Sequence, residues 1–495
     1  MEDFSTMKTS IKILCLVLSL LMLVACFAAC GDSEETTLPK AEGTENESGR
    51  NEIKDSLPAD LKFNGEKMVF FVRNQTEVYK NEMDVDKTTN NTLNDAVYYR
   101  NAAVEERLGV TIEQVGQDGG PGAYTTWNAT LRNAVLTKSG DFDSAAIHSS
   151  QGSALAVEGL YYNVLDLPHI DLTKPWWNNT IADEMTLFDT LYYLAGDICV
   201  SETASGICFF FNKDLFDKLY QTQNINLYDL VNAQKWTIDQ MHELVANAWI
   251  DEDSDGVVSE NDIVGYAEGD PSCNDGWVPA MGIKVTTMVD GYPELTFYDE
   301  HTVEAFEKVK NLHDGNPGYL AGRDFAFEKF ISGKQLFVKQ VFSGGETLRA
   351  MSDSYGVLPF PKFDEEQDDY HSLVNVFASL VVVLSTCNEP EKVGATLELM
   401  AAESYKQVTP AYFEVCLQGK YSDAPEDAEM YDRIIKSFVF NFGQTYSTKS
   451  LGSVGGLFRD LSKDIAQTYE ANKVKYETAL EDLVNKLDDI SFMMG

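Results

Sequence analysis

The most constraining feature of this sequence is an alternation of strand and helix patterns between residues 67 and 147. Residues 67–73, 110–115 and 142–147 are short apolar runs typical of strands. Residues 92–108 and 124–136 carry apolar side chains at helical spacing, and the first of these segments is followed by a glycine. Strands that alternate with helices in this way form a parallel sheet covered by helices. The sequence therefore predicts an α/β fold.

Length and charge narrow the class of protein. The chain has 495 residues, enough for two or three domains of about 150 residues each. It carries 79 Asp and Glu against 38 Lys and Arg, a formal net charge of −41. A nucleic-acid-binding protein needs a basic surface to neutralise phosphates, and an anionic membrane repels an acidic protein. We therefore expect no nucleic-acid partner, and any membrane contact must come from a lipid or an apolar segment.

The N-terminus supplies such a segment. Residues 13–24 form a nearly unbroken apolar run, too short for a membrane span of about 20 residues and typical of a secretory signal. The four residues that end at Cys26 (LVAC) resemble a bacterial lipobox, in which the cysteine is lipidated, for example with palmitate, and becomes the mature N-terminus. Cys30 is a poorer alternative because Phe27 stands where an aliphatic residue is usual. We expect a signal peptide over 1–25 and a lipid on Cys26; a plain cleaved signal or an uncleaved anchor are the alternatives.

A polar, acidic stretch follows the lipobox. Residues 31–37 and 42–48 lack aromatic side chains and cannot bury enough apolar surface to fold. We therefore expect a disordered acidic tether over 26–63, which would connect the lipid to the folded body.

The cysteines of the body show no metal-ligand spacing. They stand at positions 199, 208, 273, 387 and 416, without a CxxC pair. Cys199 and Cys208 could face each other across a hairpin, so a disulfide and two buried thiols are both open interpretations.

Five segments of the body carry recognisable motifs, namely residues 207–216 (ICFFFNKDLF), 236–241 (WTIDQM), 251–266 (DEDSDGVVSENDIVGY), 330–334 (FISGK) and 355–361 (YGVLPFP). In this order they resemble segments of extracellular solute-binding proteins (family 1, carbohydrate-type) of ATP-binding-cassette importers. Each is a weak signal alone, but their order over roughly residues 66–420 is fairly specific, and such receptors are often lipoproteins.

The resemblance implies a two-lobed, periplasmic-binding-protein-like fold of type II with the ligand in the cleft between the lobes. We expect one lobe over 64–185 plus 372–425, and the other over 186–371 plus 426–495. The implied protein is a monomeric receptor on the extracellular face of the cell membrane. It would deliver a small solute, a sugar or oligosaccharide, to the permease subunits of an importer. A receptor for peptides or another polar solute is the alternative by ligand.

Catalytic motifs are absent from the sequence. There is no G-x-S-x-G elbow and no H-E-x-x-H motif, and Gly333-Lys334 lacks the rest of a phosphate-binding loop. A glycoside hydrolase needs only two carboxylates brought together in space, and 79 acidic residues leave that alternative open. We expect no enzyme, with a secreted carbohydrate-active enzyme as the alternative class.

A sugar site needs an aromatic ring for the apolar face of the pyranose and polar groups for its hydroxyls. Trp176 and Trp177 follow Pro175 in a loop, which suggests one ring packed inward and one available to a ligand. Trp277 lies in a turn-rich stretch and is a candidate for the opposing ring. The alternative for all three indoles is packing in the core.

Polar candidates follow the ends of predicted strands, where open α/β sheets bind ligands. These ligand-binding candidates are Asn74, Gln75, Ser149, Ser150, Gln151, Gly345 and Glu346. The backbone amides near Gly345 open a predicted helix and could donate to a ligand. The alternative is local capping of loops.

One acidic loop has the spacing of a calcium site. Residues 251–262 offer oxygen ligands at the positions typical of a calcium loop, with Gly256 at the turn. The predicted ligands are Asp251, Asp253, Asp255, Val257 (through its carbonyl), Ser259 and Asp262. Asp262 replaces the usual glutamate, which should weaken binding. A structural Ca²⁺ and a turn capped by its own carboxylates are both open interpretations.

Overall fold

The computed structural model describes residues 45–494 apart from 270, 323–324, 418–424 and 447–450. By its contacts the chain divides after Gly49, and the fold described below is that of the unit Arg50–Gly495. The predicted signal peptide over 1–25, Cys26 and Cys30 lie outside the described residues. Among the helices that are described, none is long and apolar enough to cross a membrane.

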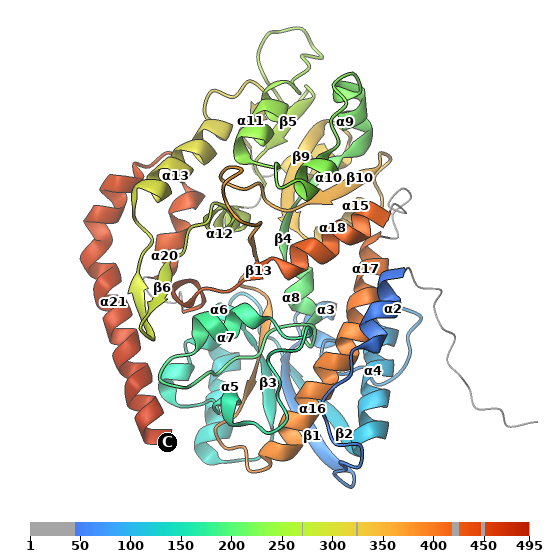
Figure 1. Cartoon of the computed structure of the whole chain (residues 1–495), viewed down its shortest axis with the longest axis vertical. Helices are drawn as coiled ribbons and strands as arrows, with labels where there is room; N and C mark the ends of the chain where they lie inside the picture. Colours follow the sequence, from blue (N-terminus) through green and yellow to red (C-terminus); the bar gives the residue numbers. More distant parts are fainter. Residues whose placement is uncertain (1–44, 270, 323–324, 418–424, 447–450, 495) are drawn as a thin grey trace, which may run out of the picture. The chain divides into compact units, whose positions relative to one another are not determined.

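The first sheet has four strands in the order β12-β3-β1-β2 (Figure 1). Its three N-terminal strands are parallel, and β12 joins antiparallel to β3. The strands are β1 (Glu66–Arg73), β2 (Val110–Gln117), β3 (Ser144–His148) and β12 (Ser379–Val383). The predicted parallel sheet is therefore confirmed, and a strand from more than 200 residues further along the chain completes it.

Helix α4 (Thr92–Leu108), between β1 and β2, has clear local start and stop signals. The side chain of Asn91 accepts a hydrogen bond from the amide of Asn94 at the N-cap. At the other end Gly109 adopts a left-handed conformation with φ 64°, which glycine tolerates without strain. The helix end predicted at Gly109 is thus confirmed.

The second sheet has five strands in the order β10-β4-β9-β5-β8. Strand β4 is antiparallel to both of its neighbours, and β5 is parallel to β8 and β9. The strands are β4 (Ile207–Asn212), β5 (Val264–Ala267), β8 (Tyr319–Leu320), β9 (Gln335–Val341) and β10 (Tyr355–Leu358). Two smaller sheets are the hairpin of β6 (Thr286–Val289) and β7 (Tyr292–Leu295), and the pair β11 (Ser372–Leu373) and β13 (Phe438–Val439).

Helices account for most of the remaining structure. Their bounds are α3 (Glu77–Lys80), α5 (Tyr124–Thr137), α6 (Ser149–Ser153), α7 (Asn179–Met185), α8 (Val200–Ala204), α9 (Lys213–Tyr220), α10 (Leu227–Asn232), α11 (Ile238–Ala246), α12 (Trp277–Ala280), α13 (Glu300–His313), α14 (Ala326–Ile331), α15 (Gly344–Leu348), α16 (Pro390–Glu403), α17 (Thr409–Leu417), α18 (Pro425–Lys436), α19 (Phe442–Thr445), α20 (Gly452–Gly455) and α21 (Ile465–Met494), with α2 (Glu45–Glu52) preceding them.

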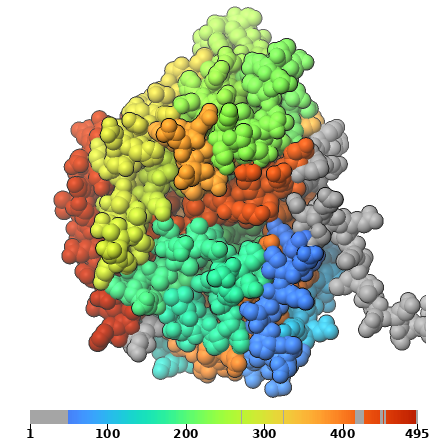
Figure 2. Space-filling view, in the orientation of Figure 1, coloured from blue at the N-terminus to red at the C-terminus, as the bar shows by residue number. Residues whose placement is uncertain are grey.

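Two large apolar clusters form the core, one around each main sheet. Helix α21 contributes Ile465, Tyr469 and Tyr476 to the cluster of the second sheet, and Leu480 and Leu487 to that of the first. The helix also runs beside β7 along one edge of this unit (Figure 2). The proposed lobe boundaries stay a prediction, and the C-terminal helix packs on both cores rather than on one.

The end of the predicted tether needs a correction. Leu57 and Phe63 are each only 8% exposed and belong to the core of the first sheet. Arg50 forms an ion pair with Asp432 at 2.5 Å. The polar segment therefore joins the folded body before residue 63, because its few apolar side chains suffice to anchor it.

The structure also answers the question of the two cysteines. Cys199 and Cys208 are both buried and are not joined to each other. They are thiols within the core rather than a disulfide.

Candidate ligand-binding site

A cavity of about 790 Å³ lies between the segment that follows β1 and the helix that follows β9. This volume falls in the range of about 300–1,000 Å³ that is typical of small-molecule sites. The first sheet's side of the cavity is lined by Thr76, Glu77, Val78, Tyr79, Asn81, Asn90, Asn91, Thr92, Leu93, Asn94 and Val97. Val200 of α8 and Ser343, Glu346 and Arg349 around α15 complete the lining, so the cavity joins segments that follow β1 to the helix that follows β9.

Four asparagines belong to the polar part of this lining. Asn81 donates to a carboxylate oxygen of Glu77 at 3.0 Å and to the side-chain oxygen of Asn94 at 3.2 Å. Asn91 caps helix α4, and Asn90 adopts a left-handed φ of 58°. The amides are therefore held by each other and by the backbone, which presents their remaining donors and acceptors in fixed positions.

Arg73 is the last residue of strand β1 and contacts a residue of the cavity lining. The side chain is buried, and its Nη2 donates to the carbonyl of Phe377 and the hydroxyl of Ser379, both at 2.8 Å. Its guanidinium lies 4.1 Å from the centre of the Tyr79 ring, which lines the cavity. Burial lowers the pKa of Arg73 and raises that of Tyr79, so the phenol stays neutral.

His148 ends strand β3 next to Arg73. Its Nδ1 accepts hydrogen bonds from the amides of Ser150 and Gln151 at 3.3 and 3.4 Å. Burial, together with the positive charge of Arg73, lowers the pKa of His148 to about 3, so the imidazole is neutral. The rings of Tyr124 and Phe377 meet it edge-on at 4.8 and 5.6 Å, and Phe377 is 40% exposed. The carboxyl ends of β1 and β3 thus carry a group of aromatic and imidazole rings.

The polar residues predicted from strand ends lie around this edge. Asn74 is exposed and Gln75 half-buried directly after β1. Ser149 donates to the carbonyl of Val376 at 2.8 Å, and Ser150 and Gln151 form the first turn of α6. Glu346 lines the cavity. A ligand role for all of these residues stays a prediction.

The amide of Gly345 is not available as predicted. Its N–H donates to the carbonyl of Phe342 at 2.9 Å, and the N–H of Glu346 donates to the carbonyl of Ser343. The turn that leads into α15 therefore satisfies these amides, and of the two residues Glu346 lines the cavity.

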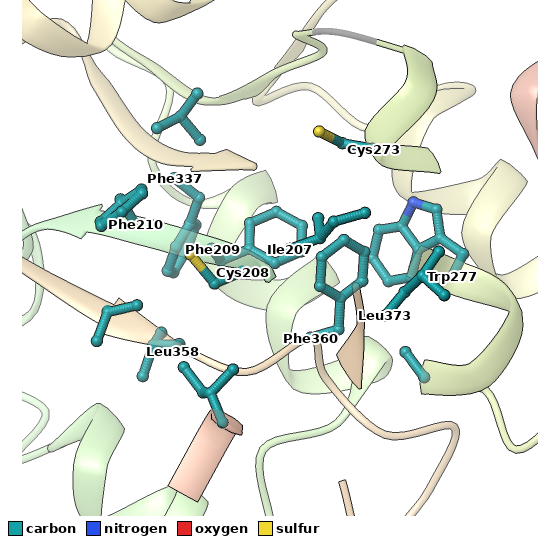
Figure 3. Close-up of a cluster of buried hydrophobic side chains, with 14 of the residues drawn as sticks. Ile207, Cys208, Phe209, Phe210, Cys273, Trp277, Phe337, Leu358, Phe360 and Leu373 are labelled. Atoms are coloured by element: carbon teal, nitrogen blue, oxygen red, sulfur yellow. The ribbon is translucent and has the colours of Figure 1, made fainter. Parts of the chain in front are cut away.

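The three tryptophans do not present exposed rings. Trp176 and Trp277 are fully buried, and Trp177 is 4% exposed. The indole nitrogens of Trp176 and Trp177 donate to the two carboxylate oxygens of Glu398 at 3.1 and 2.8 Å. Trp277 packs against Phe209 and Phe360, with ring centres 5.7 and 4.8 Å apart (Figure 3). The prediction of an available stacking ring at these positions is corrected, because a buried carboxylate and aromatic neighbours hold the indoles in the core.

The acidic loop brings three of its predicted ligands together. Carboxylate oxygens of Asp251, Asp253 and Asp255 all lie within 4.8 Å of one another. Asp262 points elsewhere, since it accepts hydrogen bonds from the amides of Glu252 and Ser259. Burial alone would raise the pKa of Asp262, but these hydrogen bonds outweigh it and lower the pKa. Three of the predicted carboxylates are thus clustered, while Asp262 closes the loop, and a structural Ca²⁺ in this loop stays a prediction.

Sequence patterns missed Arg73, Tyr79 and His148. A charged residue at the end of an apolar strand, followed by a tyrosine in the next turn, was the available signal. The contact that matters, from Arg73 to Ser379, joins positions 306 residues apart and has no local signature.

Comparison with known proteins identifies the fold. No family model matches the chain, and no curated protein matches it either. Among solved structures, UgpB from Mycobacterium tuberculosis in complex with glycerophosphocholine superposes with a TM-score of 0.55 at 13% identity, over 85% of this chain and 100% of that one.

Two further structures are similar. The galacto-N-biose-/lacto-N-biose I-binding protein of an ABC transporter from Bifidobacterium longum gives a TM-score of 0.53 at 12% identity, over 85% of this chain and 98% of that one. A cyclo/maltodextrin-binding protein complexed with maltotetraose gives a TM-score of 0.52 at 14% identity, over 86% of this chain and 98% of that one. The predicted periplasmic-binding-protein-like fold is therefore confirmed.

Proposed function

We propose that this chain is a solute receptor for an ATP-binding-cassette importer and that its solute is a sugar or oligosaccharide. The observation that carries the proposal is a cavity with four asparagines in its lining, which lies between segments that follow strands of the two main sheets. An amide both donates and accepts hydrogen bonds, as a sugar hydroxyl does, so the two groups match. Two of the similar structures were solved with a sugar bound, which agrees with this solute class.

The proposed receptor acts by binding and motion rather than by chemistry. A ligand that contacts both walls of the cavity favours the closed arrangement of the two sheets, and shifts the population toward it by its preference for that state. The permease subunits of the importer would recognise the closed receptor. We propose that the receptor works as a monomer at the extracellular face of the cell membrane, attached through a lipid on Cys26.

A binding screen followed by a turnover assay tests the proposal. Purified protein is screened by thermal shift against neutral oligosaccharides, peptides and polyols, and hits are measured by calorimetry. Each hit is then incubated with the protein and analysed by chromatography. Stabilisation by a sugar without a change in that sugar supports the receptor. Hydrolysis of the sugar would instead favour a carbohydrate-active enzyme, and hits among peptides alone would replace the solute class.

A further inference from the structure

The aromatic ring that a sugar would need is present in the cavity itself. Tyr79 is the one aromatic residue among the described residues that line it. It lies in α3, directly after the strand that carries Arg73, and it is half-buried rather than sealed in the core. A partly buried ring with open space beside it can still contact a ligand, unlike the indoles of Trp176 and Trp177.

The guanidinium of Arg73 fixes this ring. Arg73 is itself fixed by two contacts. Its Nη2 donates hydrogen bonds to two oxygens near the start of β12. The aliphatic part of its side chain packs against Gly119, where an added Cβ would lie 2.5 Å from the Arg73 Cγ. With the cation on one face of Tyr79, a ligand can contact only the other face or the edge of the ring. A ring that is already immobilised loses little entropy when a ligand binds.

The charges of the lining select the ligand. The lining includes the carboxylates of Glu77 and Glu346 and the guanidinium of Arg349, and Lys80 pairs with Glu77 at 3.5 Å. These charges nearly balance and give an anionic ligand little net attraction, whereas hydroxyl groups match both the carboxylates and the asparagine amides.

We propose that a neutral oligosaccharide stacks on Tyr79 in this cavity, and that Arg73 is the positioning residue that holds the ring. This inference rests on the proposed function, and it adds the residue that recognises the sugar and the charge of the ligand.

Calorimetry on matched variants tests the stacking ring. The probes are maltotetraose, cellotetraose, xylotetraose and mannotetraose, with tetragalacturonate as the anionic probe. Tyr79→Ala should weaken binding of the neutral ligand roughly 10- to 100-fold, as expected from the loss of a buried apolar face. Tyr79→Phe keeps the face of the ring, and its affinity for the sugar should stay within about threefold of that of the parent. Tyr292→Ala, at a tyrosine 54% exposed on the β6–β7 hairpin, is the matched control and should change nothing.

A double-mutant cycle tests the role of Arg73. Arg73→Lys keeps the charge but not the planar cation over the ring, so it should weaken binding in the parent and have no further effect in Tyr79→Ala. A merely structural role would instead give the same loss in both backgrounds. Melting temperatures of all variants show that they are folded.

The possible outcomes distinguish this inference from the proposed function on which it rests. If a neutral sugar binds without turnover and with equal affinity to the parent and to Tyr79→Ala, Tyr79 is not the stacking ring, while the proposed receptor function is still supported. If tetragalacturonate is the only probe that binds, the proposal of a neutral ligand is wrong, but the proposed receptor function is not. Failure of all five probes to bind overturns the inference as stated, while the wider screen decides the function.

Discussion

The indole N–H of Trp177 donates to Oε2 of Glu398 at 2.8 Å, across 221 residues of sequence. The neighbouring Trp176 donates to the other oxygen of the same carboxylate. Glu398 lies on α16 and is fully buried. The loop that carries the two indoles is therefore attached to a helix of the first core, and its tryptophans stabilise the fold.

Trp177→Ala should destabilise the protein strongly. Truncation of a buried tryptophan typically costs about 3–5 kcal/mol. It also removes one of the two donors to Oε2 of Glu398, the other being the amide of Asp171 at 3.2 Å. Denaturant unfolding measured in the absence of ligand checks this. Trp177→Phe keeps an aromatic ring but loses the indole N–H, so its free energy of unfolding should lie between those of the parent and of Trp177→Ala. An unchanged stability with a specific loss of sugar affinity would instead restore Trp177 as a stacking ring.

Glu398 should make stability fall as the pH rises. Burial raises the pKa of Glu398 to about 7, although the two indole donors lower it, whereas an unfolded glutamate titrates near about 4.3. Between these values the native state holds a proton that the unfolded state has released, so the free energy of unfolding decreases with rising pH and levels off above pH 7 or so. Glu398→Gln keeps an acceptor for the indoles and removes this titration.

The measurement compares melting temperatures from pH 4.5 to 8 for the parent and for Glu398→Gln. Burial also raises the pKa of Asp197 to about 6 and that of Glu202 to about 8. The loss of stability of the parent with rising pH therefore has several contributions, and the contribution of Glu398 is the difference between the melting curves of the parent and of Glu398→Gln. Glu481→Gln, at an exposed position on α21, is the control. Parallel curves for the parent and Glu398→Gln would show that Glu398 is ionised throughout.

Local patterns predicted the scaffold well and the site poorly, for a physical reason. Strand β1 and the end of α4 at Gly109 follow from apolar runs and from a cap, which are local properties of the chain. Whether a tryptophan is exposed depends on partners such as Glu398 that lie far away in sequence. The same holds for Tyr79, whose role depends on a cation that β12 holds in place. The rule that ligands bind at the ends of strands points to seven polar candidates. Among these seven, Glu346 is the one that lines the cavity.

A lipid on Cys26, which stays a prediction, would decide where the protein is found in cells. Cys26 follows an apolar run that is too short to span a membrane, so attachment should depend on its acyl chains. Cys26→Ala should move the protein from the membrane fraction to the medium, or shift processing to Cys30. Fractionation and mass spectrometry of the mature N-terminus measure this, and Cys15→Ala is the control. A mature chain that begins after Cys30 without a lipid would contradict the prediction.

Calcium should stabilise the protein through the loop of Asp251, Asp253 and Asp255. A ligand that binds only the native state stabilises it by RT ln(1 + [L]/Kd), about 2.7 kcal/mol at a hundredfold excess over Kd. The melting temperature should therefore rise with Ca²⁺ concentration and fall on addition of a chelator. Asp255→Ala removes one of the three clustered carboxylates and should abolish the dependence while the protein stays folded, because the Asp255 side chain is exposed.

The control for the calcium loop is Glu260→Gln, at an exposed carboxylate of the same loop that lies outside the cluster. This variant should keep the full dependence of the melting temperature on Ca²⁺, because it removes a similar charge without removing a ligand. Equal melting temperatures of the parent in chelator and in millimolar Ca²⁺ would make the loop a turn whose carboxylates cap their own backbone amides. The hydrogen bonds from the amide of Gly256 to Asp251 and from the amide of Val257 to Asp255 already provide such caps.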